Sequence, residues 1–243
     1  MMTSFSCKAT QQGLSSSDFE RVIAIIRDGG LCILPSDSSY VLTGRVTEQG
    51  ITNDIDILLK RNGMKMPLAF SSLRQINTYM KLSNMAHHFL ERLTPGGLTL
   101  VALPEVDEFI GVSCAYLNAD GTIGVRLTDS LVERQLADDF PLPSTPIRDA
   151  NNHEVLTAEE ALAIIQDRLS LINKPRRIAL IDGPVPYPSG LSTVVKEVQY
   201  HGYWNIVVIR QGRITMDVIK KTAIACQYEG ILLSEGKKTL RRV

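Results

Sequence analysis

The 243-residue chain has no excess of charge of either sign, because 26 lysine and arginine residues balance 26 aspartate and glutamate residues. A net charge of zero creates no global field that would draw the protein to nucleic acid or to a membrane surface. Any basic site must therefore be local. No apolar run approaches the roughly 18 residues that span a bilayer, and the N-terminus lacks the features of a signal peptide. We therefore expect a cytoplasmic protein with no membrane partner.

Cysteine and the common catalytic motifs are also scarce. The four cysteines show neither CxxC spacing nor a paired pattern, which favours free thiols in a reducing compartment. The sequence contains no GxxxxGK phosphate loop, no GxGxxG after a strand, no GxSxG and no HExxH. The four histidines have no metal-ligand partner at usable spacing, so we predict no metal site built by the protein.

Hydrophobic residues make up 44% of the chain and charged residues 21%, as in ordinary globular proteins. Helical and strand-like patterns alternate along it, which predicts one α/β domain with a mixed sheet. We expect a lead-in over residues 1–16, the domain over 17–214 and a helical tail over 215–243. The expected helices cover 17–28, 51–62, 72–80, 84–93, 130–140 and 158–172. The expected strands cover 31–34, 67–71, 98–103, 123–127, 177–181, 192–198 and 205–210.

One stretch organises the chain, Leu31-Cys-Ile-Leu-Pro-Ser-Asp-Ser-Ser-Tyr40. Its apolar run is too short for a helix, and Pro35 cannot donate to a strand ladder, so we predict a buried strand that stops pairing at Pro35. Ser36, Ser38 and Ser39 then place hydroxyl groups at a strand end, where α/β sheets tend to bind ligands. Taken alone, the same hydroxyls would also be explained as the caps of a turn.

Several segments in order resemble the YrdC-like family, whose best-known members make threonylcarbamoyladenylate for tRNA modification. The resemblance runs from about Ser17 to about Arg213. Its spelling is closest to the YciO-like branch, whose activity is less securely assigned. The segments that carry it are Leu34-Pro-Ser-Asp-Ser-Ser-Tyr40, Thr94-Pro-Gly-Gly-Leu-Thr99, Gly124-Val-Arg-Leu127, Pro141-Leu-Pro-Ser-Thr145, Ser192-Thr-Val-Val195 and Arg210-Gln-Gly212.

The resemblance implies a twisted mixed sheet with flanking helices and a concave basic face that holds ATP. It also implies a nucleotidyltransferase reaction, in which threonine and bicarbonate form a carbamate that attacks the α-phosphate of ATP and expels pyrophosphate, with Mg²⁺ assisting. Such chemistry needs positioned cations and hydroxyls more than an acid or a base.

The same resemblance assigns roles to individual residues. Ser36 and Ser38 would hold the amino acid, while Lys60 and Arg126 would neutralise carboxylate and phosphate as the catalytic cations. The nucleotide contacts would come from Ser144, Thr145, Ser192, Thr193 and Arg210. We expect the strand ends at Pro35, Ser144 and Ser192 to converge with Arg126 on one face. We also expect Arg126→Ala to weaken nucleotide binding with little change in melting temperature.

Three departures from the family pattern lie on the side expected to face the nucleotide. In the family's KxR motif the arginine is replaced by Asn62, so Arg61 or Arg148 is a candidate substitute. In its STSAN motif Pro146 and Arg148 replace a serine and an asparagine. The glycines after Tyr40 are replaced by Val41 and Thr43, which resist positive φ, so the loop there should follow another path.

Two classes of function therefore stay open. One is a threonylcarbamoyladenylate synthase-like enzyme acting on ATP and a small amino acid. The other is a YciO-like module that binds RNA (tRNA or double-stranded) or nucleotide, with catalysis impaired or redirected. A cluster of local basic residues fits both, whereas the neutral total charge and the lack of interleaved aromatic residues argue against RNA.

Overall fold

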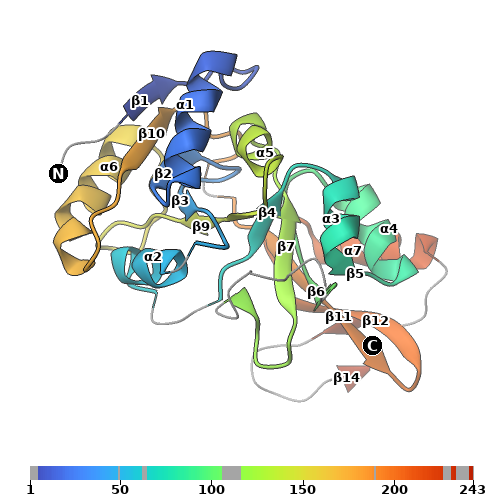
Figure 1. The fold of residues 1–243 in the computed structure, drawn as a ribbon. Helices are drawn as coiled ribbons and strands as arrows, with labels where there is room; N and C mark the ends of the chain where they lie inside the picture. The colour runs from blue at the N-terminus through green and yellow to red at the C-terminus, as the bar shows by residue number, and fades with distance from the viewer. Residues whose placement is uncertain are drawn as a thin grey trace.

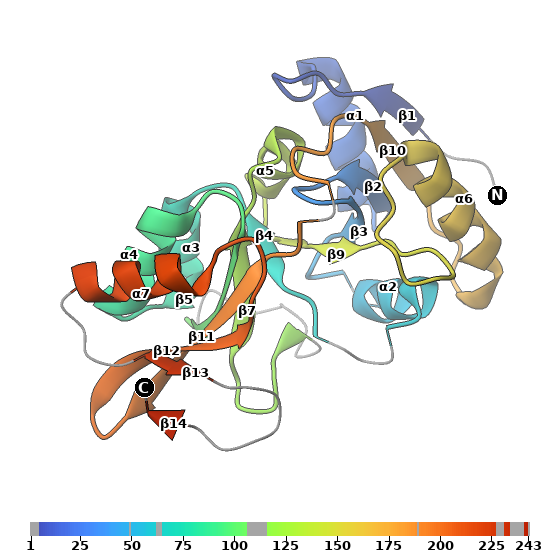
Figure 2. The same cartoon turned by 180° about the vertical axis from the view of Figure 1, so that it is seen from behind.

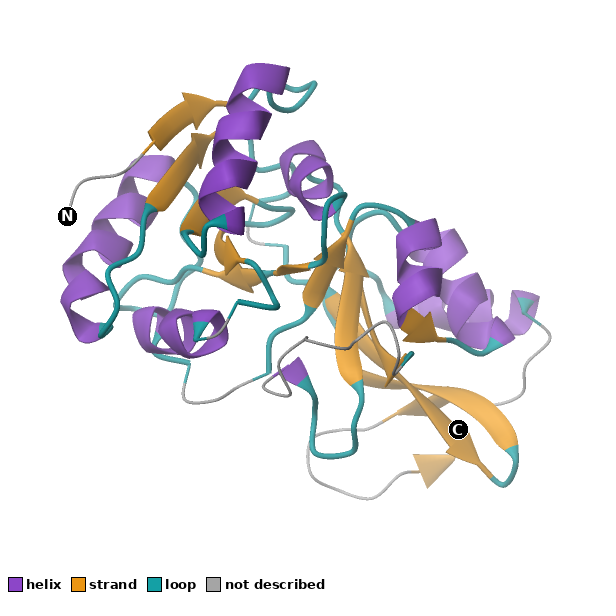
Figure 3. Cartoon of the chain, in the orientation of Figure 1, coloured by secondary structure: helices purple, strands orange, loops and turns teal. Residues whose placement is uncertain are grey.

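The computed structural model describes residues 5–48, 50–61, 65–105, 116–188, 190–226, 231–233 and 241–242. Helices and strands alternate along the chain, so the predicted α/β class is confirmed (Figure 1 and Figure 3). No helix among these residues is both long and apolar enough to cross a bilayer. The helices are α1 (Ser16–Arg27), α2 (Ile51–Leu59), α3 (Leu73–Tyr79), α4 (Asn84–Leu93), α5 (Leu131–Ala137), α6 (Ala158–Arg168), the short 3₁₀ helix η2 (Leu169–Leu171) and α7 (Met216–Ala225).

Hydroxyl side chains fix where most of these helices begin. The N-cap residue of a helix accepts a hydrogen bond from a backbone N–H that has no partner inside the helix. Ser15 does this for α1, Ser130 for α5 and Thr157 for α6. Lys60 ends α2 in the left-handed conformation, with φ of 52°. The predicted extension of this helix to Lys60 and beyond is therefore wrong.

The strands form two mixed sheets rather than one. The first has the order β1-β10-β2-β3-β9, with β1 and β10 parallel to β2 and with β3 and β9 antiparallel to their neighbours. Phe5–Lys8, which lie within the expected lead-in of residues 1–16, form β1 at the edge of this sheet. The strands are β1 (Phe5–Lys8), β2 (Leu31–Pro35), β3 (Tyr40–Gly44), β9 (Thr145–Pro146) and β10 (Ile178–Asp182).

The second sheet has the order β14-β13-β12-β11-β6-β7-β4-β8, with β5 paired to β6 off this path. The view from behind in Figure 2 shows α7 beside α4, which it contacts. The strands are β4 (Leu68–Phe70), β5 (Met80–Lys81), β6 (Leu98–Pro104), β7 (Ile123–Leu127), β8 (Leu142–Pro143), β11 (Thr193–Tyr200), β12 (Tyr203–Arg210), β13 (Ile231–Leu233) and β14 (Arg241–Arg242).

Strand β2 lies between two hydrophobic cores. All five of its residues are buried, and alternate side chains point to opposite faces of a strand. Leu31 and Ile33 pack into the larger core, whereas Cys32 and Leu34 pack into the smaller core beneath α1 and α5. Burial on both faces explains why the sequence of this strand is continuously apolar. The predicted buried strand is confirmed, and its pairing ends at Pro35, opposite Tyr40.

The segment after Tyr40 takes an extended path. Val41 and Thr43 lie in β3, where β-branched residues fit well, and neither has a positive φ. The segment that was expected to follow another path without the family's glycines is thus a strand, which pairs with β2.

Ser144 is the point at which the chain passes from one sheet to the other. The preceding strand, β8, pairs with β4 in the larger sheet, while the following strand, β9, pairs with β3 in the smaller one. The Ser144 N–H donates to the carbonyl oxygen of Pro67 at 2.9 Å, which anchors this crossing.

Candidate functional site

A cavity of about 330 Å³ is lined by residues of both sheets. Its size lies at the lower end of the range for small-molecule sites. Seven of the eleven residues proposed from the sequence as site residues line it, and they come from segments far apart in the chain. They are Ser38, Arg61, Arg126, Ser144, Arg148, Ser192 and Arg210. Four others, Ser36, Lys60, Thr145 and Thr193, are not among the lining residues.

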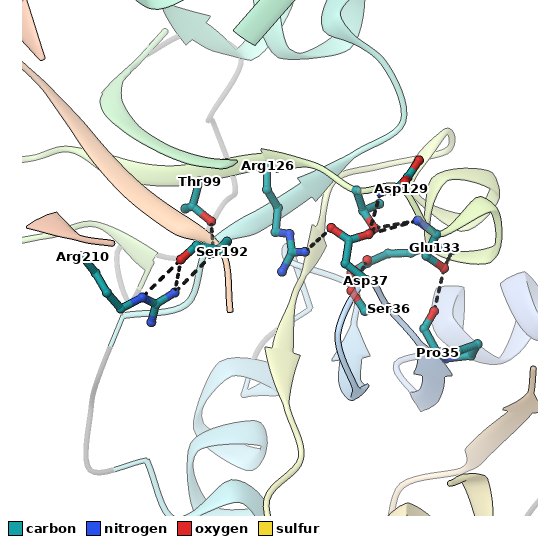
Figure 4. A network of polar contacts seen from close by, with 11 residues as sticks. Pro35, Ser36, Asp37, Thr99, Arg126, Asp129, Glu133, Ser192 and Arg210 are labelled. Atoms are coloured by element: carbon teal, nitrogen blue, oxygen red, sulfur yellow. Dashed lines mark hydrogen bonds and ion pairs between the residues drawn. The ribbon is translucent and has the colours of Figure 1, made fainter. Parts of the chain in front are cut away.

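Arg126 on β7 is held by a buried ion pair. Its Nη2 donates to Asp37 Oδ2 at 2.6 Å, and the side chains are 9% and 3% exposed, respectively. Figure 4 shows the guanidinium group of Arg126 directed at Asp37, which follows Pro35 at the end of β2. The pair therefore links the two sheets at the edge of the cavity.

Asp37 collects further donors from the segment that joins β7 to α5. Its Oδ1 accepts from Thr128 Oγ1 at 2.7 Å and from the backbone N–H groups of Asp129 and Ser130 at 2.6 and 3.1 Å. Burial alone would raise the pKa of Asp37, but the charge of Arg126 and these hydrogen bonds together lower it. The Asp37 carboxylate is thus ionised and fixed.

The sequence did not single out Asp37 as a site residue, although it lies inside the resembling segment. A useful signal was available, because an aspartate at the end of a fully apolar strand needs a buried partner. The partner of Asp37 is Arg126, which lies on β7, another mostly apolar strand.

Ser36 faces away from the cavity. Its Oγ donates to Glu133 Oε2 on α5 at 2.5 Å, and Ser130 Oγ donates to the carbonyl oxygen of Pro35 at 2.6 Å. These contacts tie the end of β2 to the start of α5. Ser38 lines the cavity, so the two serines that were paired for the amino acid have different surroundings.

The three other residues outside the lining also have identified positions. Lys60 is exposed at the end of α2. Thr145 is fully buried opposite Leu42, with no hydrogen-bond partner for its Oγ1. Thr193 Oγ1 donates to the Ile214 carbonyl oxygen at 2.9 Å and accepts from the N–H groups of Gly212 and Ile214. Thr193 thus fastens the segment after β12 to the start of β11.

Ser192 and Arg210 contact each other where β11 begins and β12 ends. Arg210 Nη2 donates to the Ser192 carbonyl oxygen at 2.9 Å and to its Oγ at 3.2 Å. Ser192 Oγ is also 2.8 Å from Thr99 Oγ1 on β6 (Figure 4). Because one hydroxyl joins Thr99 to Arg210, the guanidinium group has a defined position beside the cavity.

Arg148 is held within a short loop that follows β9. Its Nη1 donates to the Asn152 carbonyl oxygen at 2.7 Å, and its Nη2 donates to Glu154 Oε1 at 3.0 Å. An antiparallel bridge between Arg148 and Glu154 closes the loop, which turns at Asn152 with φ of 67°. Both Arg148 and Glu154 line the cavity. Glu154 is not predictable from the sequence pattern as a site residue, because its position depends on this turn.

Arg61 enters the cavity from the end of α2. Its Nε lies 3.7 Å from Asp56 Oδ1, and its Nη2 donates to the Lys65 carbonyl oxygen at 2.9 Å. Asn62, which replaces the family's arginine, lies outside the described residues.

The arginines repel one another electrostatically. Burial and, to a smaller extent, the charge of Arg148 lower the pKa of Arg61, and Asp56 opposes this shift in part. The pKa of Arg210 is lowered by burial and by the charges of Arg148 and Arg126, against the opposing effect of Glu154. Neighbouring guanidinium groups that raise each other's free energy are stabilised by a bound anion. The arrangement therefore suits phosphate or carboxylate groups.

No group of three or more histidine, cysteine, aspartate or glutamate side chains suited to a metal occurs within the part of the chain that the structure describes. Cys7, Cys32 and Cys226 are free thiols, while Cys114 lies outside the described residues.

A family model described as "Telomere recombination", for the Sua5, YciO and YrdC proteins, matches residues 24–212. An uncharacterised Haemophilus influenzae protein is 27% identical over 119 residues, which span 48% of this chain and 55% of that protein. Escherichia coli YciO is 23% identical over 56% of this chain and 69% of its own.

Two solved structures share the fold. That of E. coli YciO covers 89% of this chain and 99% of its own, with a TM-score of 0.71 and 21% identity. That of P. abyssi Sua5 complexed with L-threonine covers 90% of this chain and 61% of its own, with a TM-score of 0.72 and 18% identity.

Proposed function

Because the chain belongs to the Sua5–YciO–YrdC family, we propose that it is a threonylcarbamoyladenylate synthase-like enzyme that acts in the cytoplasm on ATP, bicarbonate and a small amino acid. The observation that carries this proposal is the cavity in which Arg61, Arg126, Arg148 and Arg210 meet three serine side chains. Threonine is our choice of amino acid, because a structural neighbour, P. abyssi Sua5, was determined in complex with L-threonine.

The proposed reaction has two steps. Threonine and bicarbonate condense to an N-carboxy carbamate with loss of water. A carbamate oxygen then attacks the α-phosphorus of ATP, and the bond from that phosphorus to the bridging oxygen breaks, so that pyrophosphate leaves and threonylcarbamoyl-AMP remains. The threonylcarbamoyl group would then be passed to tRNA, with AMP as the leaving group.

The residues of the cavity would act mainly by placing two anions against each other. Arg126 is fixed by Asp37 through its Nη2 and lines the cavity, so it would hold the carboxylate or carbamate. Arg148 and Arg210 would bind phosphate oxygens, to which a planar guanidinium group can donate twice. Neutralising the charge that develops on the leaving pyrophosphate lowers the barrier to phosphoryl transfer.

Mg²⁺ would enter as part of the nucleotide substrate. The cavity has one described carboxylate, that of Glu154, and this fits a metal ion held chiefly by phosphate oxygens and water rather than by a protein cage.

Release of pyrophosphate tests the proposal. Purified protein given ATP, Mg²⁺, bicarbonate and threonine should release pyrophosphate, and omission of threonine or bicarbonate should abolish the signal. Pyrophosphate release that does not depend on threonine would point to another amino acid, and serine and alanine would be tried in parallel. If no amino acid supports pyrophosphate release, the proposed synthase activity is rejected.

A second candidate function is a module that binds nucleotide or RNA (tRNA or double-stranded) with impaired catalysis. One observation favours it. Arg148 stands where the family motif has an asparagine, and it is paired with Glu154. Pro146, which replaces the motif's serine, also lines the cavity. In that case titration with ATP or tRNA would show binding while pyrophosphate release stayed at background. Restoring Pro146→Ser and Arg148→Asn together should then raise the activity.

A further inference from the structure

Glu154 has an unusual position within the cavity. Among the described lining residues it supplies the one carboxylate, beside four guanidinium groups and the ammonium group of Lys65. Its side chain is 6% exposed, and Oε1 receives the hydrogen bond from Arg148 Nη2. The second oxygen, Oε2, is buried without a hydrogen-bond partner. A carboxylate that is so buried and has a partner for only one of its oxygens calls for an explanation.

The charge of Glu154 acts on more than its direct partner. Burial alone would lower the pKa of Arg126, but the charges of Asp37, Glu133 and Glu154 outweigh it and raise the pKa. Glu154 likewise opposes the lowering of the pKa of Arg210. Three arginines from β7, β12 and the loop after β9 therefore share this carboxylate as a counter-charge. Nothing comparable balances them from within the described lining of the cavity.

We propose that Glu154 is a built-in counter-ion that competes with the ligand's anionic groups for the cavity arginines and thereby lowers the affinity of the cavity for polyphosphates. The inference rests on the proposed function, in that the cavity must accept a polyphosphate. When the cavity is empty, Glu154 compensates the clustered cations. When a phosphate chain enters, it must share Arg148 with this carboxylate and approach a like charge. Weaker retention of the product pyrophosphate would follow.

Glu154→Gln separates this role from that of a positioning residue. The amide oxygen of glutamine accepts a hydrogen bond from Arg148 Nη2 as the carboxylate does, and the Asn152 carbonyl oxygen is unaffected, so Arg148 keeps its place. Only the negative charge is removed. A counter-ion then predicts tighter binding of anions, whereas a residue that merely positions Arg148 predicts little change.

Glu159→Gln provides a matched control. Glu159 is exposed in the first turn of α6, a short distance along the chain, and is not among the lining residues of the cavity. The control removes the same charge from the protein without touching the site.

The experiment is calorimetric titration of the natural protein and both variants with inorganic pyrophosphate and with ATP, at two salt concentrations. We expect Glu154→Gln to bind both ligands about tenfold more tightly at low salt, with a smaller gain at high salt, since charge effects are screened. Glu159→Gln should stay within about twofold of the natural protein. A second variant, Glu154→Ala, should also bind more tightly and covers the case in which the glutamine variant folds poorly.

The outcomes separate the two proposals. If the natural protein binds ATP while neither Glu154 variant binds more tightly, the counter-ion role of Glu154 is rejected and the proposed nucleotide site is retained. If neither the natural protein nor any variant binds pyrophosphate or ATP, the proposed function and the counter-ion both fail.

Discussion

The two walls of the cavity hold their arginines in different ways. On one wall, called the Asp37 wall because Asp37 lies behind it, the lining residue Arg126 is buried against this carboxylate, which is fixed by three further hydrogen bonds. On the other wall, called the loop wall, Arg148 and Arg210 are more exposed, and each is held by one or two residues, Arg148 by Asn152 and Glu154 and Arg210 by Ser192. The Arg126 side chain is 9% exposed, whereas that of Arg148 is 35% exposed.

This difference predicts different consequences of substitution. A buried ion pair that loses one partner leaves an uncompensated charge in a medium of low dielectric constant, which destabilises the fold. An exposed arginine loses little when its pair is broken, because water replaces the partner. Substitutions on the Asp37 wall should therefore change stability, whereas those on the loop wall should change ligand binding.

The largest effect is expected for Asp37→Asn. The variant leaves Arg126 buried without a counter-charge and removes the anionic acceptor of four hydrogen bonds. We expect the free energy of unfolding, measured by urea denaturation, to fall by about 3–5 kcal/mol. Asp139→Asn, which breaks the more exposed pair with Arg27, should cost far less, because water replaces the lost partner. Equal losses in the two variants would contradict the distinction between the walls.

The same pair predicts a dependence of stability on pH. The pKa of Asp37 is lowered in the folded protein, so the unfolded state binds the proton more readily. The stabilisation is complete above the pKa of the unfolded chain, roughly pH 4, and is lost as the pH falls through the lower folded value. The difference in unfolding free energy between the natural protein and Asp37→Asn should thus shrink between about pH 5 and pH 2. A difference that stays constant over this range would argue against an ionised Asp37.

On the loop wall, Arg148→Asn should mainly weaken binding. Loss of a guanidinium group from an anion site should raise the Kd for ATP by about ten- to a hundredfold. Arg148 is 35% exposed but its partner Glu154 is only 6% exposed, so the melting temperature should also fall, by less than in Asp37→Asn because Arg126 and Arg210 still compensate Glu154. Arg177→Asn, in another partly exposed pair, serves as the control and should change neither quantity. Unchanged ATP binding in Arg148→Asn would remove Arg148 from the site.

The smallest effect on stability is expected at Ser144, where the two walls meet. Its Oγ lines the cavity but is buried without a hydrogen-bond partner. Removing an unsatisfied hydroxyl is close to neutral or slightly stabilising, so Ser144→Ala should change the free energy of unfolding by less than about 1 kcal/mol. If the hydroxyl contacts the ligand, ATP affinity should still fall severalfold in the same variant. A marked loss of stability would mean that Ser144 has a structural partner.

Much of the fold was predictable because its signals are local. The strand that ends at Pro35 and the helices expected over 51–62, 84–93 and 158–172 follow from local pattern. The structure confirms β2, α2, α4 and α6, although α2 and α6 end earlier than expected. Strand β1 gave only a weak signal in four residues, and it is a strand because it pairs with β10. Local pattern cannot reveal a pairing partner that far along the chain.

The candidate site was predictable in its residue types but only partly in its geometry. Ser36 and Ser38 look alike in the sequence, but the turn in which Ser36 N–H donates to Ser39 O reverses the chain between them. Arg126 was expected to matter for binding alone. Its ion pair with Asp37 contradicts this, and Arg126→Ala should lower the melting temperature as well.

The strand order of the smaller sheet has a consequence for how the protein folds during its synthesis. β1 and β2 are near neighbours in the chain, yet β10 lies between them in the sheet. The hairpin of β2 and β3 can form as soon as it is made, but β1 has no strand to pair with until Ile178–Asp182 has been translated. Contacts of such long sequence separation form slowly, because a large loop must close first. The N-terminal edge of the sheet should therefore be the last part of the smaller sheet to acquire its native hydrogen bonds, and pulse-labelling hydrogen exchange during refolding should find the amides of β1 protected after those of β2 and β3.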